Sequence, residues 1–155
     1  MPFRAATESD LSALVELQRD FYAHERIDFD ATIALQSMRT LIHDASLGRL
    51  IVIEHENAIV GFAAIMFGFS LEFRGRNAIL DELYVAPHAR GRGLGTEALR
   101  MAEELCAAEG VQVLHLEVDR TNTRAKALYH RHGFVDHDRH LMSKPMRSER
   151  RRPAG

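Results

Sequence analysis

The stretch Ile79-Leu80-Asp81-Glu82-Leu83-Tyr84-Val85-Ala86-Pro87-His88-Ala89-Arg90-Gly91-Arg92-Gly93-Leu94-Gly95-Thr96 decides the fold. Its first part, as far as Val85, is rich in β-branched and aromatic residues and predicts a strand. Pro87 ends that strand, because proline cannot donate to a β-ladder. After the glycines, apolar residues recur at helical spacing as far as Cys106. The glycine-rich segment therefore joins a strand to the start of a helix.

This position predicts a phosphate-binding loop. The first N–H groups of a helix have no intrahelical partner, and the helix dipole favours negative charge there. Glycines allow the backbone to approach a ligand closely and to adopt a positive φ. Arg90 and Arg92 can add charge-assisted contacts to a phosphate.

Two common phosphate loops do not match the segment. A P-loop requires Gly-Lys-Ser/Thr, but Gly95 is followed by Thr96-Glu97. A dinucleotide fingerprint requires Gly-x-Gly-x-x-Gly/Ala, and neither pair of glycines meets that pattern in the right strand context. The pattern that fits is Arg-x-x-Gly-x-Gly at Arg90, Gly93 and Gly95. It resembles the pyrophosphate loop of the GNAT superfamily of acyl-CoA-dependent N-acetyltransferases.

A second motif supports this resemblance. The pattern Asn122-x-x-Ala125-x-x-x-Tyr129-x-x-x-Gly133-Phe134 is similar to the second GNAT signature and follows the first at the usual distance. The resemblance extends from the helix after Thr7 to Met142. It implies an α/β (α+β) fold of GNAT type, with a mixed, mostly antiparallel central sheet of six to seven strands flanked by about four helices. We assign residues 1–146 to this N-acetyltransferase domain.

Local patterns place the remaining elements. Thr7-Glu8-Ser9-Asp10 matches a capping box before an amphipathic helix that reaches Phe21. A second helix is predicted from Asp30 to His43. The segment 22–29 between them is either a solvated connection or a wall of the acceptor pocket. The other predicted elements are strands 50–54, 58–71, 79–85 and 111–118, a helix from Thr123 to His132 capped by Asn122, and a last hairpin from Phe134 to Lys144.

Composition narrows the class of protein. The 155 residues suggest one domain. No segment approaches the ~18 uncharged apolar residues of a membrane span, so we expect no membrane partner. No signal peptide is recognised, and the single cysteine excludes an internal disulfide. Both observations favour a cytoplasmic protein. The Arg-rich tail 147–155 is predicted to be disordered and carries four Arg and one Glu, a net charge of +3. Since the whole chain has a formal net charge of −2, residues 1–146 carry a net charge of −5. This negative net charge argues against binding of nucleic acid and favours binding of a positively charged substrate.

The resemblance implies transfer of an acetyl group from acetyl-CoA, as a co-substrate, to an amine acceptor. The pantetheine arm is expected between strands 79–85 and 111–118, paired with the backbone of Leu83, Tyr84 and Val85. An N–H near Leu83 would stabilise the oxyanion. Asn122 would cap its helix or bind the cofactor. The pyrophosphate is expected on the backbone N–H groups of Gly91, Arg92, Gly93, Leu94, Gly95 and Thr96.

Catalytic candidates follow from the chemistry of amines. A free alkylamine has a pKa of about 10.4, so only about one molecule in two thousand is neutral at pH 7, and a general base helps. Asp81 and Glu82 are the candidates, with Glu117 a weaker one. Because successive strand residues face opposite sides, we expect only one of the pair to face the substrate. Either carboxylate can instead pair with a neighbouring arginine: Arg74, Arg76 or Arg90.

Tyr129 matches the family tyrosine that protonates the leaving thiolate, and its alternative role is core packing on a helix face. Cys106 lies among apolar residues without a flanking base, which predicts a buried hydrophobe and favours direct attack in a ternary complex over an acyl-enzyme. The histidines from His130 to His140 match no zinc spacing, so no metal is expected.

The leading function is acetylation of a primary amine of a small molecule. Acetylation of a protein N-terminus or lysine, and a non-catalytic acyl-CoA-binding module, are the alternatives. The resemblance also suggests a possible homodimer.

Overall fold

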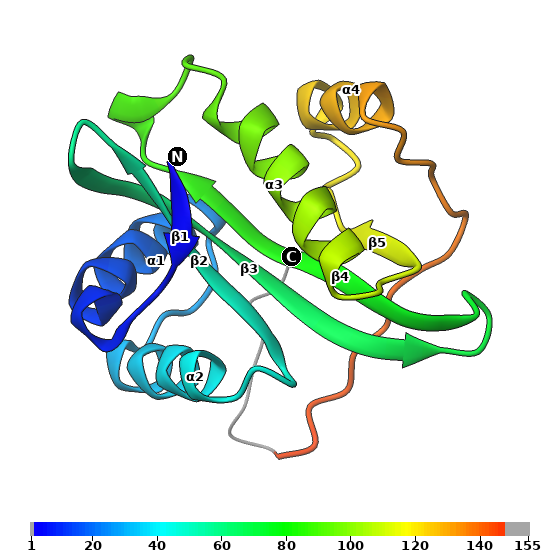
Figure 1. The fold of residues 1–155 in the computed structure, drawn as a ribbon, viewed down its shortest axis with the longest axis horizontal. Coiled ribbons are helices and arrows are strands. Elements are labelled where there is room, and N and C mark those ends of the chain that lie inside the picture. The colour runs from blue at the N-terminus through cyan, green and yellow to red at the C-terminus, as the bar shows by residue number, and fades with distance from the viewer. Residues whose placement is uncertain (1, 148–155) are drawn as a thin grey trace.

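The computed structural model describes residues 2–147, which form one mixed sheet covered by helices on both faces (Figure 1). The sheet has five strands within this part of the chain, in the order β1-β2-β3-β4-β5. The strands are β1 (Phe3–Ala5), β2 (Gly48–His55), β3 (Ala58–Ser70), β4 (Gly75–Val85) and β5 (Val113–Leu116). The helices are α1 (Leu11–Glu25), α2 (Ala31–His43), α3 (Leu94–Ala108) and α4 (Thr123–Arg131), with short 3₁₀ turns at Glu8–Asp10 and Pro87–Ala89.

The predicted helix caps are confirmed. The Asn122 side chain accepts the Ala125 N–H at 3.1 Å, as predicted. The Asp30 carboxylate, which is not among the predicted caps, accepts the Ile33 N–H at 3.1 Å. Asp10 accepts the backbone N–H of Thr7, as the predicted capping box requires, although the first turn there is a 3₁₀ helix that leads into α1. These side chains satisfy backbone donors that the helix itself leaves without partners.

The predicted antiparallel meander of β2, β3 and β4 is confirmed, whereas the strand number is lower than predicted. β5 pairs with β4 in the parallel direction and ends the sheet. The expected last hairpin, Phe134 to Lys144, is wrong: no strand forms there in the described chain. The segment is dense in Asp, His and Arg, and Phe134 packs on the core while Val135, Leu141 and Met142 are exposed. Without an apolar face, it gains little from pairing with the sheet.

A β-bulge interrupts β4 at Asp81. Ala64 of β3 pairs with Glu82, whereas the next residue, Ile65, pairs with Leu80, so Asp81 is the extra residue. Pairing between β4 and β5 covers only Asn77–Leu80 and therefore stops where the bulge begins. Bulges bend a strand and end its pairing locally. The edge of β4 that faces β5 is consequently open to a ligand from Asp81 to Val85.

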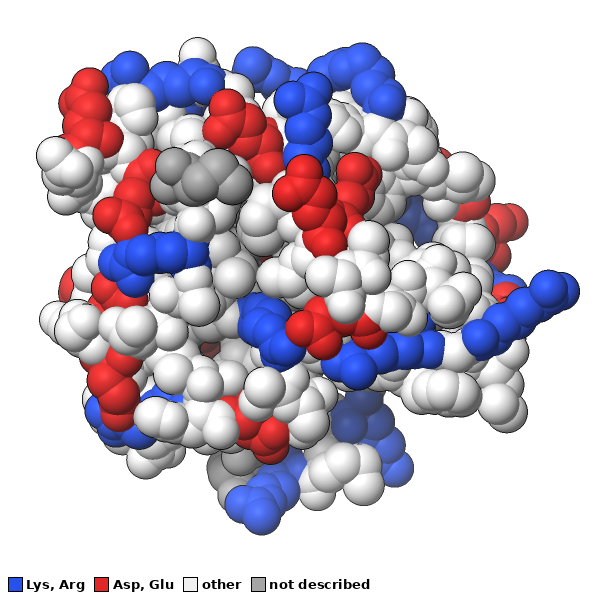
Figure 2. Space-filling view, viewed as in Figure 1, with Lys and Arg blue, Asp and Glu red and all other residues white. Residues whose placement is uncertain are grey.

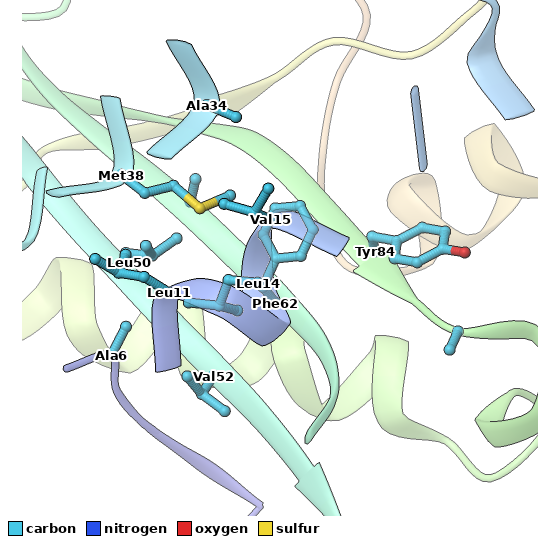
Figure 3. Close-up of a cluster of buried hydrophobic side chains, with 12 residues drawn as sticks. Ala6, Leu11, Leu14, Val15, Ala34, Met38, Leu50, Val52, Phe62 and Tyr84 are labelled. Atoms are coloured by element: carbon cyan, nitrogen blue, oxygen red, sulfur yellow. The ribbon is translucent and has the colours of Figure 1, made fainter. Parts of the chain in front are cut away.

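Two apolar layers hold the helices on the sheet. Helices α1 and α2 cover one face, and α3 and α4 lie over the other (Figure 1). On the first face, side chains of α1 and α2 meet those of β2, β3 and β4 around the fully buried Phe62 and Leu14 (Figure 3). This layer fixes α1 against the strands that carry the candidate catalytic residues.

Shortening one core side chain tests this packing. Leu14 is 0% exposed, so Leu14→Ala should lower the free energy of unfolding by about 2–5 kcal/mol. Ser12→Ala, on an exposed position of the same helix, should change it by less than about 0.5 kcal/mol. Urea unfolding followed by circular dichroism measures both values. Equal stability of the two variants would contradict the packing described.

Candidate active site

A cavity of about 1010 Å³ lies between α1, α2 and the sheet. It is called the larger cavity below, because the two other cavities described measure about 310 Å³ and 380 Å³. Gln18 and Tyr22 of α1 form one wall, and residues of α2 form another. The segment 22–29, for which two roles were open, contributes Tyr22, Asp28 and Phe29 to this wall. Apolar side chains of β2 and β3 close the bottom of the cavity.

Asp81 and Glu82 both line this cavity, which corrects the expectation that only one of them faces it. Strict alternation would send adjacent side chains to opposite faces of the sheet. The bulge at Asp81 places two residues of β4 opposite one of β3 and so removes the alternation at this point. Neighbouring carboxylates therefore share one space.

Hydrogen bonds from α1 hold Glu82. Gln18 Nε2 donates to Glu82 Oε1 at 2.9 Å, and Tyr22 Oη donates to Glu82 Oε2 at 2.5 Å. Burial raises the pKa of Glu82, the two hydrogen bonds lower it, and the charge of Asp81 raises it further, with a net upward direction. No arginine appears among these contacts, which differs from the alternative of pairing with Arg74, Arg76 or Arg90. A carboxylate with a raised pKa accepts a proton more readily.

The glycine-rich loop borders a second cavity of about 310 Å³, together with Leu83, Tyr84 and Val85. Gly91 and Gly93 have φ of +79°, a conformation that favours glycine. A Cβ added at Gly91, Gly93 or Gly95 would meet no atom within 4 Å. The side chain of Leu94, in contrast, is buried and anchors the loop to the core. The loop thus presents backbone and open space to the cavity at the start of α3.

Charge around the loop suits an anionic ligand. In Figure 2, Lys and Arg side chains gather along the edge over the glycine-rich loop and α4, whereas the rest of that face mixes both signs. Arg90 has a further contact: its Nε donates to the carbonyl of Val85 at 2.7 Å, and its guanidinium lies 5.5 Å from the Tyr84 ring centre. Its expected phosphate contact, and that of Arg92, stay predictions.

Tyr129 lies on α4 beside a third cavity of about 380 Å³ and not beside the two cavities described above. Its ring packs edge-on against Phe134, with 5.9 Å between ring centres, and burial raises the pKa of its hydroxyl. The hydroxyl is protonated at neutral pH, as a proton donor requires, and the upward direction of its pKa makes it a weaker acid. The structure is therefore compatible with both the catalytic and the packing role.

Other candidates lie apart from the carboxylate pair. Glu117 is exposed just after β5 and lines neither of the first two cavities. Cys106 of α3 is buried in an apolar cluster with residues of the sheet and of α3 itself, and burial raises the pKa of its thiol. The prediction of a buried hydrophobe is confirmed. Among residues 2–147, no three His, Cys, Asp or Glu side chains gather as a metal ion requires, and no helix is long and apolar enough to cross a membrane. That the protein needs no metal stays a prediction.

The sequence does not predict Gln18 as a site residue, and it includes Tyr22 only as part of the segment 22–29, without a contact to Glu82. A signal was present, because Leu14, Gln18 and Tyr22 are four residues apart and so lie on one side of a helix. Leu14 faces the core, and polar side chains that continue its row point to a buried partner. The identity of that partner, 60 residues away in the case of Tyr22, depends on the tertiary fold.

Comparison with protein families gives one match over most of the chain: the model of the Acetyltransferase (GNAT) family covers residues 11–134. An uncharacterized N-acetyltransferase of Bacillus subtilis, YhfO, is 29% identical over 88% of this chain and 91% of its own length. The thialysine N-epsilon-acetyltransferase of Bos taurus is 27% identical over 86% of this chain and 83% of its own.

Solved structures agree on the fold. An integron cassette protein from a salt-marsh metagenome superposes with a TM-score of 0.84 and 29% identity, covering 94% of this chain and 91% of that one. A protein of Clostridium acetobutylicum described as a predicted acetyltransferase, determined with acetyl-CoA, has a TM-score of 0.76 and 21% identity, covering 92% of this chain and 94% of that one. The second likeness concerns the fold alone.

The open space over Gly95 generates a test of cofactor binding. Gly95 lies in the first turn of α3 without a positive φ, so Gly95→Leu should fold normally and place its side chain where the pyrophosphate is expected. We expect the Kd for acetyl-CoA to rise at least about 100-fold, since the phosphates lose their contacts with the helix start. Isothermal titration calorimetry measures the change.

Ala107→Leu, exposed near the other end of α3, is the matched control and should bind acetyl-CoA like the wild type. Gly93→Leu is less informative because its positive φ adds strain of the backbone itself. Unchanged affinity in a folded Gly95→Leu variant would rule out the loop as the pyrophosphate site.

Proposed function

Because this chain belongs to the GNAT acetyltransferase family and is an acetyl-CoA-dependent N-acetyltransferase, we propose that its acceptor is the primary amine of a small, positively charged molecule. The acetyl group passes by direct attack of the amine on acetyl-CoA in a ternary complex. Acetyl-CoA lies along the open edge of β4 with its pyrophosphate on the loop from Gly91 to Thr96. The acceptor enters the larger cavity between α1 and α2.

The observation that carries this proposal is the charge of the larger cavity. Four carboxylates line it, those of Asp28, Asp30, Asp81 and Glu82, whereas none of its lining residues within the described chain is Lys, Arg or His. Apolar side chains form the rest of its wall. Such a space attracts a cation that also carries an apolar portion.

Relatives are consistent with this acceptor class. The matched bovine and murine proteins are named for acetylation of thialysine, a small amine, and their lengths are covered to 83%. A cavity of about 1010 Å³ is large enough for a molecule of that size. The alternative acceptor is a protein, through its N-terminus or a lysine side chain. The homodimer and the cytoplasmic location stay predictions.

The reaction needs a neutral amine next to the thioester. One carboxylate of the Asp81 and Glu82 pair accepts a proton from the bound ammonium, directly or through water. The amine nitrogen then forms a bond to the carbonyl carbon, and the backbone N–H near Leu83 stabilises the oxyanion. The C–S bond breaks, and the thiolate of CoA takes a proton from the Tyr129 hydroxyl. The attacking nitrogen releases its second proton, which returns through water to Tyr129, so the net proton released is the one held by the carboxylate. The products are an acetylated amine and free CoA.

Removing negative charge from the cavity tests the acceptor class. The double variant Asp28→Asn/Asp30→Asn should raise the KM for a cationic acceptor about 5- to 30-fold, because losing the two charges weakens the attraction of a cation by roughly 1–2 kcal/mol in total. Asn retains the cap of α2 that Asp30 provides, so the fold is preserved. The Kd for acetyl-CoA should stay the same, because these residues do not line the loop cavity.

Release of CoA with a panel of diamines, amino acids, neutral-tailed monoamines and a lysine-bearing peptide provides the measurement. Asp20→Asn, on an exposed position of α1, is the matched control. Turnover of the peptide alone would favour the protein-acetylating alternative, and no turnover of any amine would overturn the proposal.

Tyr129→Phe tests the general acid. The ring and its contact with Phe134 remain, and only the proton donor is lost. We expect kcat to fall about 10²- to 10⁴-fold, while the Kd for acetyl-CoA and the KM for the acceptor change by no more than a few-fold. If the variant retains more than about half of the wild-type kcat with chemistry rate-limiting, Tyr129 has the packing role only.

A further inference from the structure

The side chain of Glu82 is held from outside its own strand. Gln18 and Tyr22, one turn apart on α1, each donate to a different oxygen of the carboxylate, at 2.9 Å and 2.5 Å. The two donors also contact one another, with 3.2 Å between Gln18 Nε2 and Tyr22 Oη. All three side chains line the larger cavity. Each carboxylate oxygen has two acceptor positions, so one on each oxygen is left for a ligand.

The type of donor distinguishes Glu82 from Asp10, a carboxylate that an arginine holds. Asp10 is held by the guanidinium of Arg4 through two contacts, at 2.7 Å and 2.9 Å, and its pKa lies well below its usual range. A carboxylate held in this way does not take up a proton near neutral pH. Glu82 has neutral donors, which fix its orientation without a positive charge. It therefore keeps the ability to bind a proton.

From this geometry we propose that Gln18 and Tyr22 are positioning residues that hold Glu82 as the general base, so that Glu82 and not Asp81 accepts the proton of the acceptor ammonium. The proposal rests on the proposed function, since it requires an amine acceptor. In this step the N–H bond of the ammonium breaks, its electron pair stays on nitrogen for attack, and the proton binds a Glu82 oxygen. Asp81 is exposed, so water screens its charge.

The charges around Glu82 fix the direction of the effect. Burial and the adjacent Asp81 raise the pKa of Glu82, whereas the Tyr22 and Gln18 hydrogen bonds lower it. Asp28 and Asp30 line the same cavity, and none of its described lining residues is cationic. Removing the Tyr22 hydroxyl takes away an influence that favours the charged form, so the pKa of Glu82 must rise.

The direct test is a titration of Glu82 in the protein without substrate. In protein labelled with ¹³C at glutamate carboxyl carbons, Glu82→Gln identifies the Glu82 signal. Tyr22→Phe keeps the ring and its edge-on contacts with Phe21 and Phe29. We expect it to move the midpoint of Glu82 upward by about one pH unit, the size of one hydrogen bond to a charged group. Gln18→Leu should move it in the same direction, and Ser12→Ala should not move it.

The kinetic test uses the pH profile of kcat/KM, whose acidic limb reports the base of the free enzyme. In Tyr22→Phe this limb should shift upward with the NMR midpoint, and the rate should recover at higher pH. Glu82→Gln should lower kcat about 10²- to 10⁴-fold and abolish the limb. Asp81→Asn should retain it.

Each contrary result has a separate meaning. An unmoved Glu82 midpoint in folded Tyr22→Phe overturns the positioning role, and an unmoved midpoint in Gln18→Leu does so if Tyr22→Phe fails to fold. A limb that survives in Glu82→Gln or is lost in Asp81→Asn overturns the choice of base. No turnover with any amine overturns the proposed function and the proton step, while the titration still decides whether α1 controls Glu82.

Discussion

The β-bulge at Asp81 is the constraint on which the site depends. One additional residue in β4 has two effects at the same point of the sheet. It ends pairing with β5, which leaves the strand edge from Asp81 to Val85 open, and it directs neighbouring carboxylates into one cavity. A regular β4 would continue the parallel pairing and turn Asp81 and Glu82 to opposite faces. In the proposed function, acetyl-CoA and the acceptor meet at this point because both effects arise from one irregularity.

Helix α1 links the core to both proposed binding regions. Its first half is fixed by Leu11 and Leu14 in the core, whereas its second half contributes Gln18 and Tyr22 to the larger cavity. Phe21 and His24, from the same half, line the cavity at the glycine-rich loop. Phe21 also lies 5.2 Å from the ring of Tyr84, between centres, on the strand beneath. The packing of α1 in the core thus determines the position of side chains in both cavities, the larger one and the one at the glycine-rich loop.

What the sequence alone predicted depended on local signals. The helix from Asp30, the cap at Asn122 and the loop between β4 and α3 each follow from residues that are neighbours in the chain. The bulge at Asp81 was not foreseen, because the pairing of Ala64 and Ile65 on another strand defines it. The contact between Tyr22 and Glu82 was missed for the same reason. The hairpin predicted from Phe134 to Lys144 is wrong for a different reason: the charged residues of this segment leave it no continuous apolar face to pack on the sheet.

The contact of Arg90 with the carbonyl of Val85 has a consequence for solubility. The N–H of Ala86 bonds to Val60 of β3, so the Val85 carbonyl, on the other side of the same peptide plane, points away from that neighbour toward the open edge. Exposed strand edges are templates for pairing with other chains, and proteins protect them with charged side chains. Arg90 protects the edge of β4 in this way, because its side chain binds the Val85 carbonyl. An arginine at this position therefore leaves the edge of β4 accessible to a small ligand while it hinders pairing with a strand of another molecule, which would lead to aggregation.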